Sequence, residues 1–163
     1  MDVAIIMGSD SDWAVMQKAV EVLKSFEVEV EVTVASAHRT PDKVRDFVKN
    51  SDAKVFICAA GMAAHLAGVV ASFTTKPVIG VPLSSEPFQG LDALLSTVQM
   101  PGGIPVATMA VGGAKNAALF AVEVLALGDE SLAKKLSDYR AKMVAEVEGK
   151  SEKIKKACAE IIS

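Results

Sequence analysis

A histidine and an arginine stand side by side, His38 and Arg39, directly after a segment typical of a β-strand. A histidine side chain can take up or release a proton near neutral pH, which makes it a candidate acid or base. The guanidinium of Arg39 presents a fixed fork of N–H donors that suits phosphate or carboxylate groups. Because a single histidine is often structural, these two residues alone leave both interpretations of His38 open.

The loop after the first strand-like segment contains several small polar residues. Gly8 lets the backbone turn and approach a ligand closely. Ser9 and Ser11, together with backbone amides at a helix start, can cradle an anion, and Asp12 can accept hydrogen bonds from sugar hydroxyls. The same side chains could simply cap the helix, which is compatible with binding. His65 stands at another expected helix start, where it could donate a hydrogen bond as a neutral ring or only cap and pack.

These residues are positioned by an alternation of strand-like and helix-like segments. Uninterrupted apolar strands between helices predict a parallel sheet covered on both faces. We therefore expect an α/β fold, a flavodoxin-like three-layer sandwich with a five-stranded parallel sheet. The segment 28–34 alternates Val with Glu or Thr, which predicts an edge strand. The expected strands are 3–7, 28–34, 54–60, 77–81 and 105–111, and the expected helices lie at 13–23, from Pro41 with Thr40 as cap, at about 63–73 and at 116–127.

Ligands of open α/β sheets bind beyond the carboxyl ends of the strands. In this chain that rule selects five loops, and both histidines of the protein lie in them. The loops are 8–12, 36–40, 61–65, 84–90 and 112–116. Their convergence predicts a ligand site at this edge of the sheet.

The chain ends in a charged helical segment, 129–163, after a core expected at about 1–128. Leu132, Leu136, Tyr139, Met143 and Val147 form a narrow apolar stripe, and the pattern resumes from Ile154 to Ile161. An ordinary amphipathic surface helix is one interpretation. A second is that this helix packs onto a neighbouring subunit. The stretch 51–128 holds only seven charged side chains, which favours burial of its surface against other copies.

Composition excludes several classes of function. A chain of 163 residues suits one compact domain. Its net charge of −3 lacks the excess of positive charge that a nucleic-acid-binding surface requires. We expect no signal peptide, no membrane span and a cytoplasmic location. The two cysteines, Cys58 and Cys158, are too few for a disulfide framework, and Cys58 is interpreted as a core residue. Zinc-ligand clusters, a Gly-x-Ser-x-Gly elbow, a dinucleotide fingerprint and a carboxylate cage for magnesium are not found in the sequence.

Taken together, four loop sequences resemble the aminoimidazole ribonucleotide carboxylase/mutase family. The resemblance covers nearly the whole chain, through about residue 147, with the matching segments in order at these spacings, and Lys115-Asn116-Ala117-Ala118 fits as well. They are Met7-Gly8-Ser9-Asp10-Ser11-Asp12-Trp13, Ser36-Ala37-His38-Arg39-Thr40-Pro41-Asp42, Ala60-Gly61-Met62-Ala63-Ala64-His65-Leu66 and Val98-Gln99-Met100-Pro101-Gly102-Gly103-Ile104-Pro105-Val106. Met62 and Ala67 depart from the family pattern, since mutases often have Gly and Pro there.

The resemblance implies an enzyme of purine biosynthesis. One class moves a carboxylate within 5-(carboxyamino)imidazole ribonucleotide, and the other adds free carbon dioxide to the uncarboxylated ribonucleotide. Ala63-Ala64-His65-Leu66 resembles the mutase class, so the carboxylase is the alternative. By resemblance His38 is the general acid/base, the enzyme is a homo-octamer, and no metal or organic cofactor is needed. The expected substrate-binding residues are Gly8, Ser9, Ser11, Asp12, Ser36, Ala37, Arg39, Gly61, Ala63, His65 and Leu66.

Overall fold

The centre of the fold is a five-stranded parallel sheet. The computed structural model describes residues 1–162. Strand order is β2-β1-β3-β4-β5, the flavodoxin-like order that the sequence predicts. The strands are β1 (Val3–Met7), β2 (Val30–Val34), β3 (Val55–Gly61), β4 (Val78–Leu83) and β5 (Ala107–Thr108). Every residue of β1 and β4 is buried, whereas β2 is partly exposed at the sheet edge, as its alternating pattern predicts.

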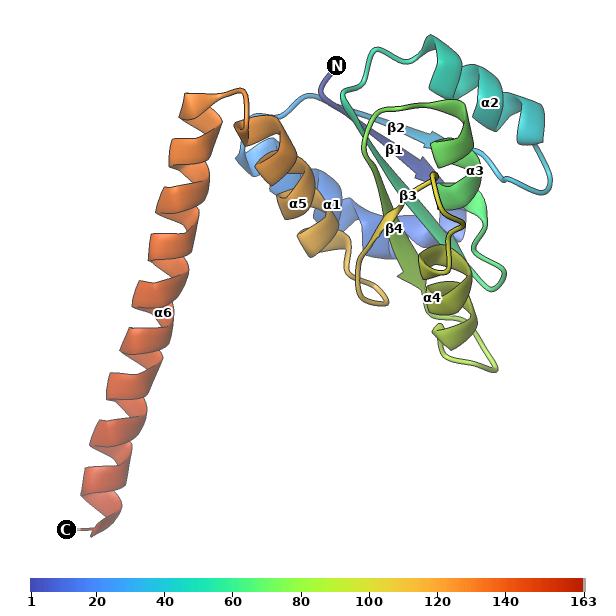
Figure 1. Ribbon diagram of the computed structural model, residues 1–163. Helices are drawn as coiled ribbons and strands as arrows, with labels where there is room; N and C mark the ends of the chain where they lie inside the picture. Colours follow the sequence, from blue (N-terminus) through green and yellow to red (C-terminus); the bar gives the residue numbers. More distant parts are fainter. Residues whose placement is uncertain (163) are drawn as a thin grey trace. The chain divides into compact units, whose positions relative to one another are not determined.

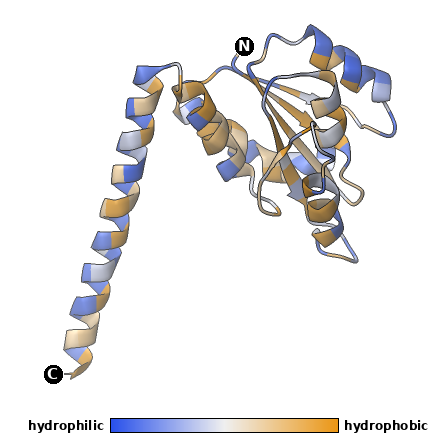
Figure 2. Ribbon diagram, in the orientation of Figure 1, coloured by the Kyte–Doolittle hydropathy of each residue, from blue (hydrophilic) through white to orange (hydrophobic). Residues whose placement is uncertain are grey.

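Helices cover both faces of this sheet, which confirms the three-layer arrangement (Figure 1). On one side lie α1 (Trp13–Ser25) and α5 (Ala114–Ala126), and on the other lie α2 (Pro41–Asn50), α3 (Leu66–Phe73) and α4 (Leu91–Val98). Alternate residues of each strand face opposite layers. Ile6 and Phe56 therefore pack with Val44 of α2 and Val70 of α3 in one apolar cluster. Figure 2 shows the hydrophobic colouring concentrated on the strands and the helices beside them.

Two elements differ from the sequence-based expectation. The fifth strand was expected at 105–111 but pairs only at Ala107–Thr108. Pro105 has no backbone N–H to donate, and Pro82 of β4 lacks one as well, so the ladder between β4 and this segment is short. The sequence analysis also missed α4, although its exposed Leu91, Leu95 and Val98 follow helical spacing.

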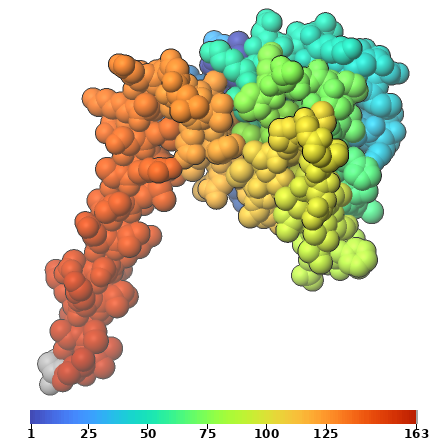
Figure 3. Space-filling model, viewed as in Figure 1, coloured from blue at the N-terminus to red at the C-terminus, as the bar shows by residue number. Residues whose placement is uncertain are grey.

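The segment after α4 lies against helix α3. Met100 packs against α3, with its Sδ 3.0 Å from where a Cβ on Gly68 would stand. Figure 3 shows this part of the chain, coloured yellow, beside the green surface of α3 and the yellow-green surface of α4.

The chain divides into two compact units, residues 1–125 and the segment from Ala126 onward. The second unit is dominated by α6 (Glu130–Ile162), a helix of 33 residues that continues through Gly149. Asp129 accepts a hydrogen bond from the Leu132 backbone N–H at 3.0 Å, which satisfies a donor of the first turn. Within residues 1–162, no helix is both long and apolar enough to cross a lipid bilayer.

Candidate active site

A cavity of about 610 Å³ opens beyond the carboxyl ends of β1, β2, β3 and β4. It brings together residues from the first four of the five loops selected by the sequence. The lining residues are Gly8, Ser9, Ser11, Asp12, Ser36, Ala37, His38, Arg39, Ala60, Gly61, Met62, Ala63, His65, Leu66, Leu83, Ser84 and Ser85. All twelve site residues expected from the sequence are among them. The fifth loop, 112–116, and the segment 98–106 do not contribute to this cavity.

The first loop is built by a short 3-10 turn, Asp10–Asp12, that follows β1. Ser9 Oγ accepts from the Ser11 backbone N–H at 3.4 Å, and Asp12 Oδ2 accepts from the Ser9 backbone N–H at 3.0 Å. This reciprocal capping fixes the loop before α1 begins. Capping and ligand contact are therefore compatible for Ser9 and Asp12, because both residues also line the cavity.

Arg39 ties the second loop to the first. Its Nη2 donates to the Gly8 backbone carbonyl at 2.8 Å, and its own backbone N–H donates to Ser36 Oγ at 3.2 Å. The remaining guanidinium donors stay available at the cavity wall. Thr40 was expected to cap α2 through its side chain, but its Oγ1 instead accepts from the Ser36 backbone N–H at 2.9 Å. This turn between Ser36 and Thr40 presents His38 and Arg39 to the cavity.

The two histidines of the chain meet across this cavity. His38 Nε2 and His65 Nδ1 are 2.9 Å apart, a hydrogen-bond distance, and the rings are edge to face with centroids 5.0 Å apart. Both side chains are exposed at the cavity mouth. His65 immediately precedes α3, as expected from the sequence, but its side chain makes no capping bond to that helix. Its ring is committed to His38 instead.

The third loop is held from behind by α4, the helix that the sequence analysis missed. Ser96 Oγ accepts from the Ala64 backbone N–H at 3.0 Å and donates to the Asp92 carbonyl at 2.6 Å. Met62 has φ +56°, a left-handed conformation that side chains disfavour. This geometry gives a physical reason why glycine suits position 62. The loop conformation is thus set by backbone geometry and by Ser96.

Burial changes the acidity of one cavity carboxyl. Loss of solvation raises the pKa of Asp12 above its ordinary value, and the hydrogen bonds from the Ser9 and Gly8 backbone oppose this effect. Arg39 is the only permanent cation among the lining residues. Because Arg39 is hydrogen-bonded to the Gly8 carbonyl, this positive charge lies where the first and second loops meet, and an anionic ligand group fits best there.

The loop after β4 adds residues that the sequence analysis placed near the site without assigning them roles. Ser84 and Ser85 line the cavity, and Ser85 Oγ is buried with no hydrogen-bond partner within the described residues. A Cβ at Gly61 would lie 3.7 Å from this hydroxyl. The sequence did place Ser84 and Ser85 directly after a parallel strand, where ligands bind. A serine in that position can equally belong to an ordinary turn, so no role followed from it. Among residues 1–162, no three His, Cys, Asp or Glu side chains gather closely enough to hold a metal ion.

Comparison with known proteins agrees with this geometry. The family model for AIR carboxylase matches residues 2–146. The chain belongs to the AIR carboxylase family. An N5-carboxyaminoimidazole ribonucleotide mutase of Methanocaldococcus jannaschii is 60% identical over 153 residues, covering 94% of this chain and 97% of that protein. The mutase of Thermotoga maritima is 48% identical over 155 residues, covering 93% and 91%.

Solved structures show the same family fold. The crystal structure of Treponema denticola PurE superposes with a TM-score of 0.85 at 32% identity and covers 93% of this chain and 96% of that one. The resemblance found in the loop sequences is thus confirmed at the level of family and fold. The family model ends within α6, so the last part of that helix lies outside it.

Proposed function

We propose that this chain is an N5-carboxyaminoimidazole ribonucleotide mutase of purine biosynthesis. It converts the N-carboxylated aminoimidazole ribonucleotide into the isomer that carries the carboxylate on ring carbon 4. Support comes from relatives of that name at 48–60% identity over nearly the whole chain. The structural observation that carries the proposal is the placement of His38, His65 and Arg39 around one cavity beyond the strand ends.

The ribonucleotide fits this cavity with its phosphate at the first and second loops. Arg39 provides cationic N–H donors for a phosphate, and the hydroxyl-bearing side chains of Ser9 and Ser11 line the same cavity wall. Asp12 accepts hydrogen bonds and faces the same space, which suits ribose hydroxyls. The base then lies towards His38 and the third loop, where Gly61 and Ala63 leave room for the transferred carboxylate.

The proton balance of the reaction suits a single imidazole. Cleavage of the N–carboxylate bond releases carbon dioxide and places one proton on the exocyclic nitrogen. Attack of ring carbon 4 on the carbon dioxide forms the new C–C bond and releases one proton from that carbon. His38 donates the first proton and accepts the second, so it returns to its starting state. Because both fragments stay in one cavity, the second step is effectively unimolecular.

Substitution of His38 by Asn tests this role. We expect His38→Asn to bind the ribonucleotide while its kcat falls by about 10²- to 10⁴-fold, the usual contribution of a positioned acid/base. Carbon NMR with substrate labelled at the transferred carboxylate follows the reaction directly. Full activity of the variant would remove His38 from the mechanism.

The carbon dioxide-dependent carboxylase is the second candidate, because the matching family model carries that description. Turnover of each ribonucleotide, with and without added bicarbonate, separates the two. A mutase retains the label of the N-carboxylated substrate when unlabelled bicarbonate is present, whereas a carboxylase requires bicarbonate and incorporates it.

We further propose that the enzyme is a cytoplasmic homo-octamer. The charge-poor stretch 51–128 and the exposed apolar residues of α6 support burial against other copies. A phosphorylated substrate does not cross a lipid bilayer unaided, so the enzyme belongs in the compartment that makes the nucleotide. Sedimentation analysis of the purified protein tests the octamer.

A further inference from the structure

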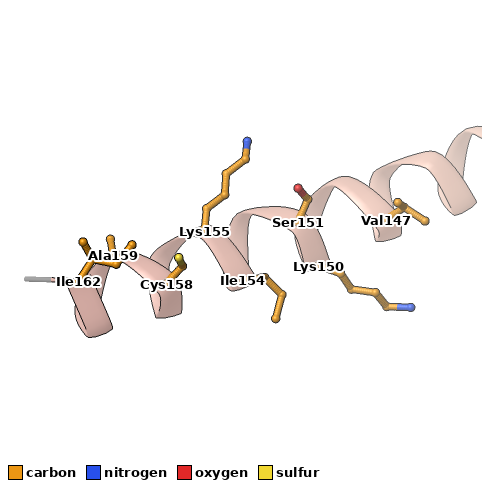
Figure 4. Close-up of a pocket in the computed structure, with 8 residues that line it drawn as sticks. All are labelled: Val147, Lys150, Ser151, Ile154, Lys155, Cys158, Ala159 and Ile162. Atoms are coloured by element: carbon orange, nitrogen blue, oxygen red, sulfur yellow. The ribbon is translucent and has the colours of Figure 1, made fainter.

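The last part of α6 carries an exposed apolar stripe with the spacing of a coiled coil. Its six residues, here called the tail stripe, alternate steps of three and four: Val144, Val147, Ser151, Ile154, Cys158 and Ile161. The exposed fractions are 64% for Val147, 68% for Ile154 and 85% for Ile161. Val147, Ile154 and Cys158 follow one another along the helix, with Lys150 and Lys155 projecting from opposite edges (Figure 4).

We propose that the tail stripe pairs, in antiparallel orientation, with the tail stripe of a second copy of this chain. A helix with apolar residues at alternating steps of three and four is complementary to another helix with the same spacing. Most of the stripe lies beyond residue 146, where the family model ends. The pairing therefore adds to the proposed function and does not depend on the catalytic site.

The charges beside the stripe disfavour a parallel pair. Glu148 and Lys155 flank one edge of the stripe and Lys150 flanks the other. In a parallel coiled coil, Lys150 of each copy would face Lys155 of the other, which places like charges together twice. A parallel pair would also set every residue of the stripe against its own counterpart, Ser151 against Ser151 included.

An antiparallel pair brings opposite charges together at one register. When Val147 faces Cys158 and Ser151 faces Ile154, all six stripe residues are matched and Glu148 of each copy lies beside Lys155 of the other. Shifting the register by one heptad in either direction instead places Lys155 against Lys155 or Glu148 against Glu148.

Lys155 can take part in this contact while keeping its partner within the helix. Its Nζ donates to Glu152 Oε1 at 2.7 Å, and an ammonium group has three donors. Gly149 lies on the opposite face of the helix, and a Cβ there would meet no atom within 4 Å, so it does not disturb the paired face.

The paired segments are short, so the contact is weak for isolated chains and effective between copies that are already held together. An antiparallel pair of identical helices has a two-fold axis, and it is compatible with closed assemblies that contain such axes. The tail stripe is thus a link between two subunits of one assembly.

Disulfide trapping of full-length protein tests the orientation and the register together. Cys158 is exposed, whereas Cys58 is buried, so Cys158 is the only native thiol positioned to react. We expect Val147→Cys, oxidised with copper phenanthroline, to give covalent dimers in which the introduced thiol of one copy is bonded to Cys158 of the other. This bond cannot form within one helix, because eleven residues span about 16 Å and a disulfide requires Cα atoms within about 7 Å.

Three controls determine the interpretation. Wild type is expected to stay monomeric on a non-reducing gel, because antiparallel pairing keeps the two Cys158 residues far apart. Val147→Cys with Cys158→Ser is expected to lose the dimer, and Ala145→Cys, on the far face of the helix, should crosslink no more than wild type. A dimer of wild type through Cys158 would show parallel pairing, and equal trapping at positions 145 and 147 would show that no helix of a second copy covers the stripe. Either result overturns the proposal, and neither depends on catalytic activity.

Discussion

His38 Nε2 lies 2.9 Å from His65 Nδ1, so the two rings share one hydrogen bond across the mouth of the cavity. One of these nitrogens must donate and the other accept, which means that at most one of them carries a proton in this arrangement. The tautomers of the two rings are therefore linked. A proton that enters or leaves the ring of His38 at Nε2 changes what His65 must do. This linkage makes His65 a positioning partner of the proposed acid/base.

We expect His65→Phe to lower kcat by about 10- to 100-fold with a small change in KM, because a ring that loses its orienting contact is misplaced for proton transfer. His65→Asn keeps a polar group near His38 and should retain more activity than His65→Phe. Steady-state kinetics over a range of pH checks this, since a shared proton also predicts an altered pH profile. An unchanged kcat in His65→Phe would mean that His65 only packs against His38 and does not position it for proton transfer.

Arg39 offers a contrasting case, in which binding should suffer more than catalysis. Arg39→Ala removes the cavity's only permanent cation and the 2.8 Å bond to the Gly8 carbonyl. We expect ribonucleotide affinity to fall by about 10- to 100-fold, the value of one hydrogen bond to a charged group. Arg39→Lys keeps the charge but loses the forked geometry, so its ribonucleotide affinity should lie between those of wild type and Arg39→Ala. Calorimetric titration with the ribonucleotide measures the difference, and an unchanged affinity would make Arg39 structural.

The sequence was sufficient to predict the strand order and the meeting of the first three loops, because both follow from apolar strands and the rule for parallel sheets. It could not predict the contact between His38 and His65, since the two are 27 positions apart and their distance depends on the registers of β2 and β3 against β1, which lies between them. The role of Ser96 in holding the third loop was hidden for a similar reason. Its helix is short, and its apolar residues are partly exposed.

Gly61 and Gly80 are expected to respond differently to an added methyl group, because Gly61 lies at the cavity and Gly80 lies in the core. A Cβ at Gly61 would make ordinary contacts, 3.5 Å from the Leu83 carbonyl and 3.7 Å from Ser85 Oγ, among atoms that line the cavity. Gly61→Ala should therefore fold normally while kcat/KM falls by about tenfold or more, because the methyl occupies space assigned to the carboxylate. Loss of stability without loss of activity would contradict this assignment.

Gly80 in β4 predicts the opposite result. A Cβ there would collide with Thr97 Cγ2 and stand 3.1 Å from Val106 Cγ1. We expect Gly80→Ala to lower the free energy of unfolding by about 1–3 kcal/mol, the usual cost of overpacking a core. Urea denaturation of Gly80→Ala and Gly61→Ala side by side measures the contrast. Equal stability of the two variants would mean that α4 moves freely against the sheet.

The pKa of Asp12 gives stability a defined dependence on pH. Burial raises this pKa above its ordinary value of 3.8, so the folded chain holds the proton more tightly than the unfolded chain. The contribution of Asp12 to stability is then complete below pH 3.8 and is lost as pH rises through its folded pKa. We expect the free energy of unfolding of wild type, relative to Asp12→Asn, to fall with rising pH across that window and then level off. Denaturation series at several pH values measure this difference. If the free energy of unfolding instead rose with pH, the pKa of Asp12 would be lowered by folding and not raised.

The two cysteines should differ in reactivity for a reason that the fold supplies. Cys58 lies inside β3 at 2% exposure, and burial raises the pKa of its thiol far above the ordinary value, so the reactive thiolate is suppressed. Cys158 is exposed on α6. A thiol reagent such as Ellman's should therefore modify Cys158 first, at the rate at which the proposed tail pairs separate, and Cys58 only at the slower rate of unfolding, and Cys158→Ser should abolish the first phase. Fast reaction of both thiols in the native protein would show that β3 opens locally, which would also loosen the third loop that presents His65 to His38.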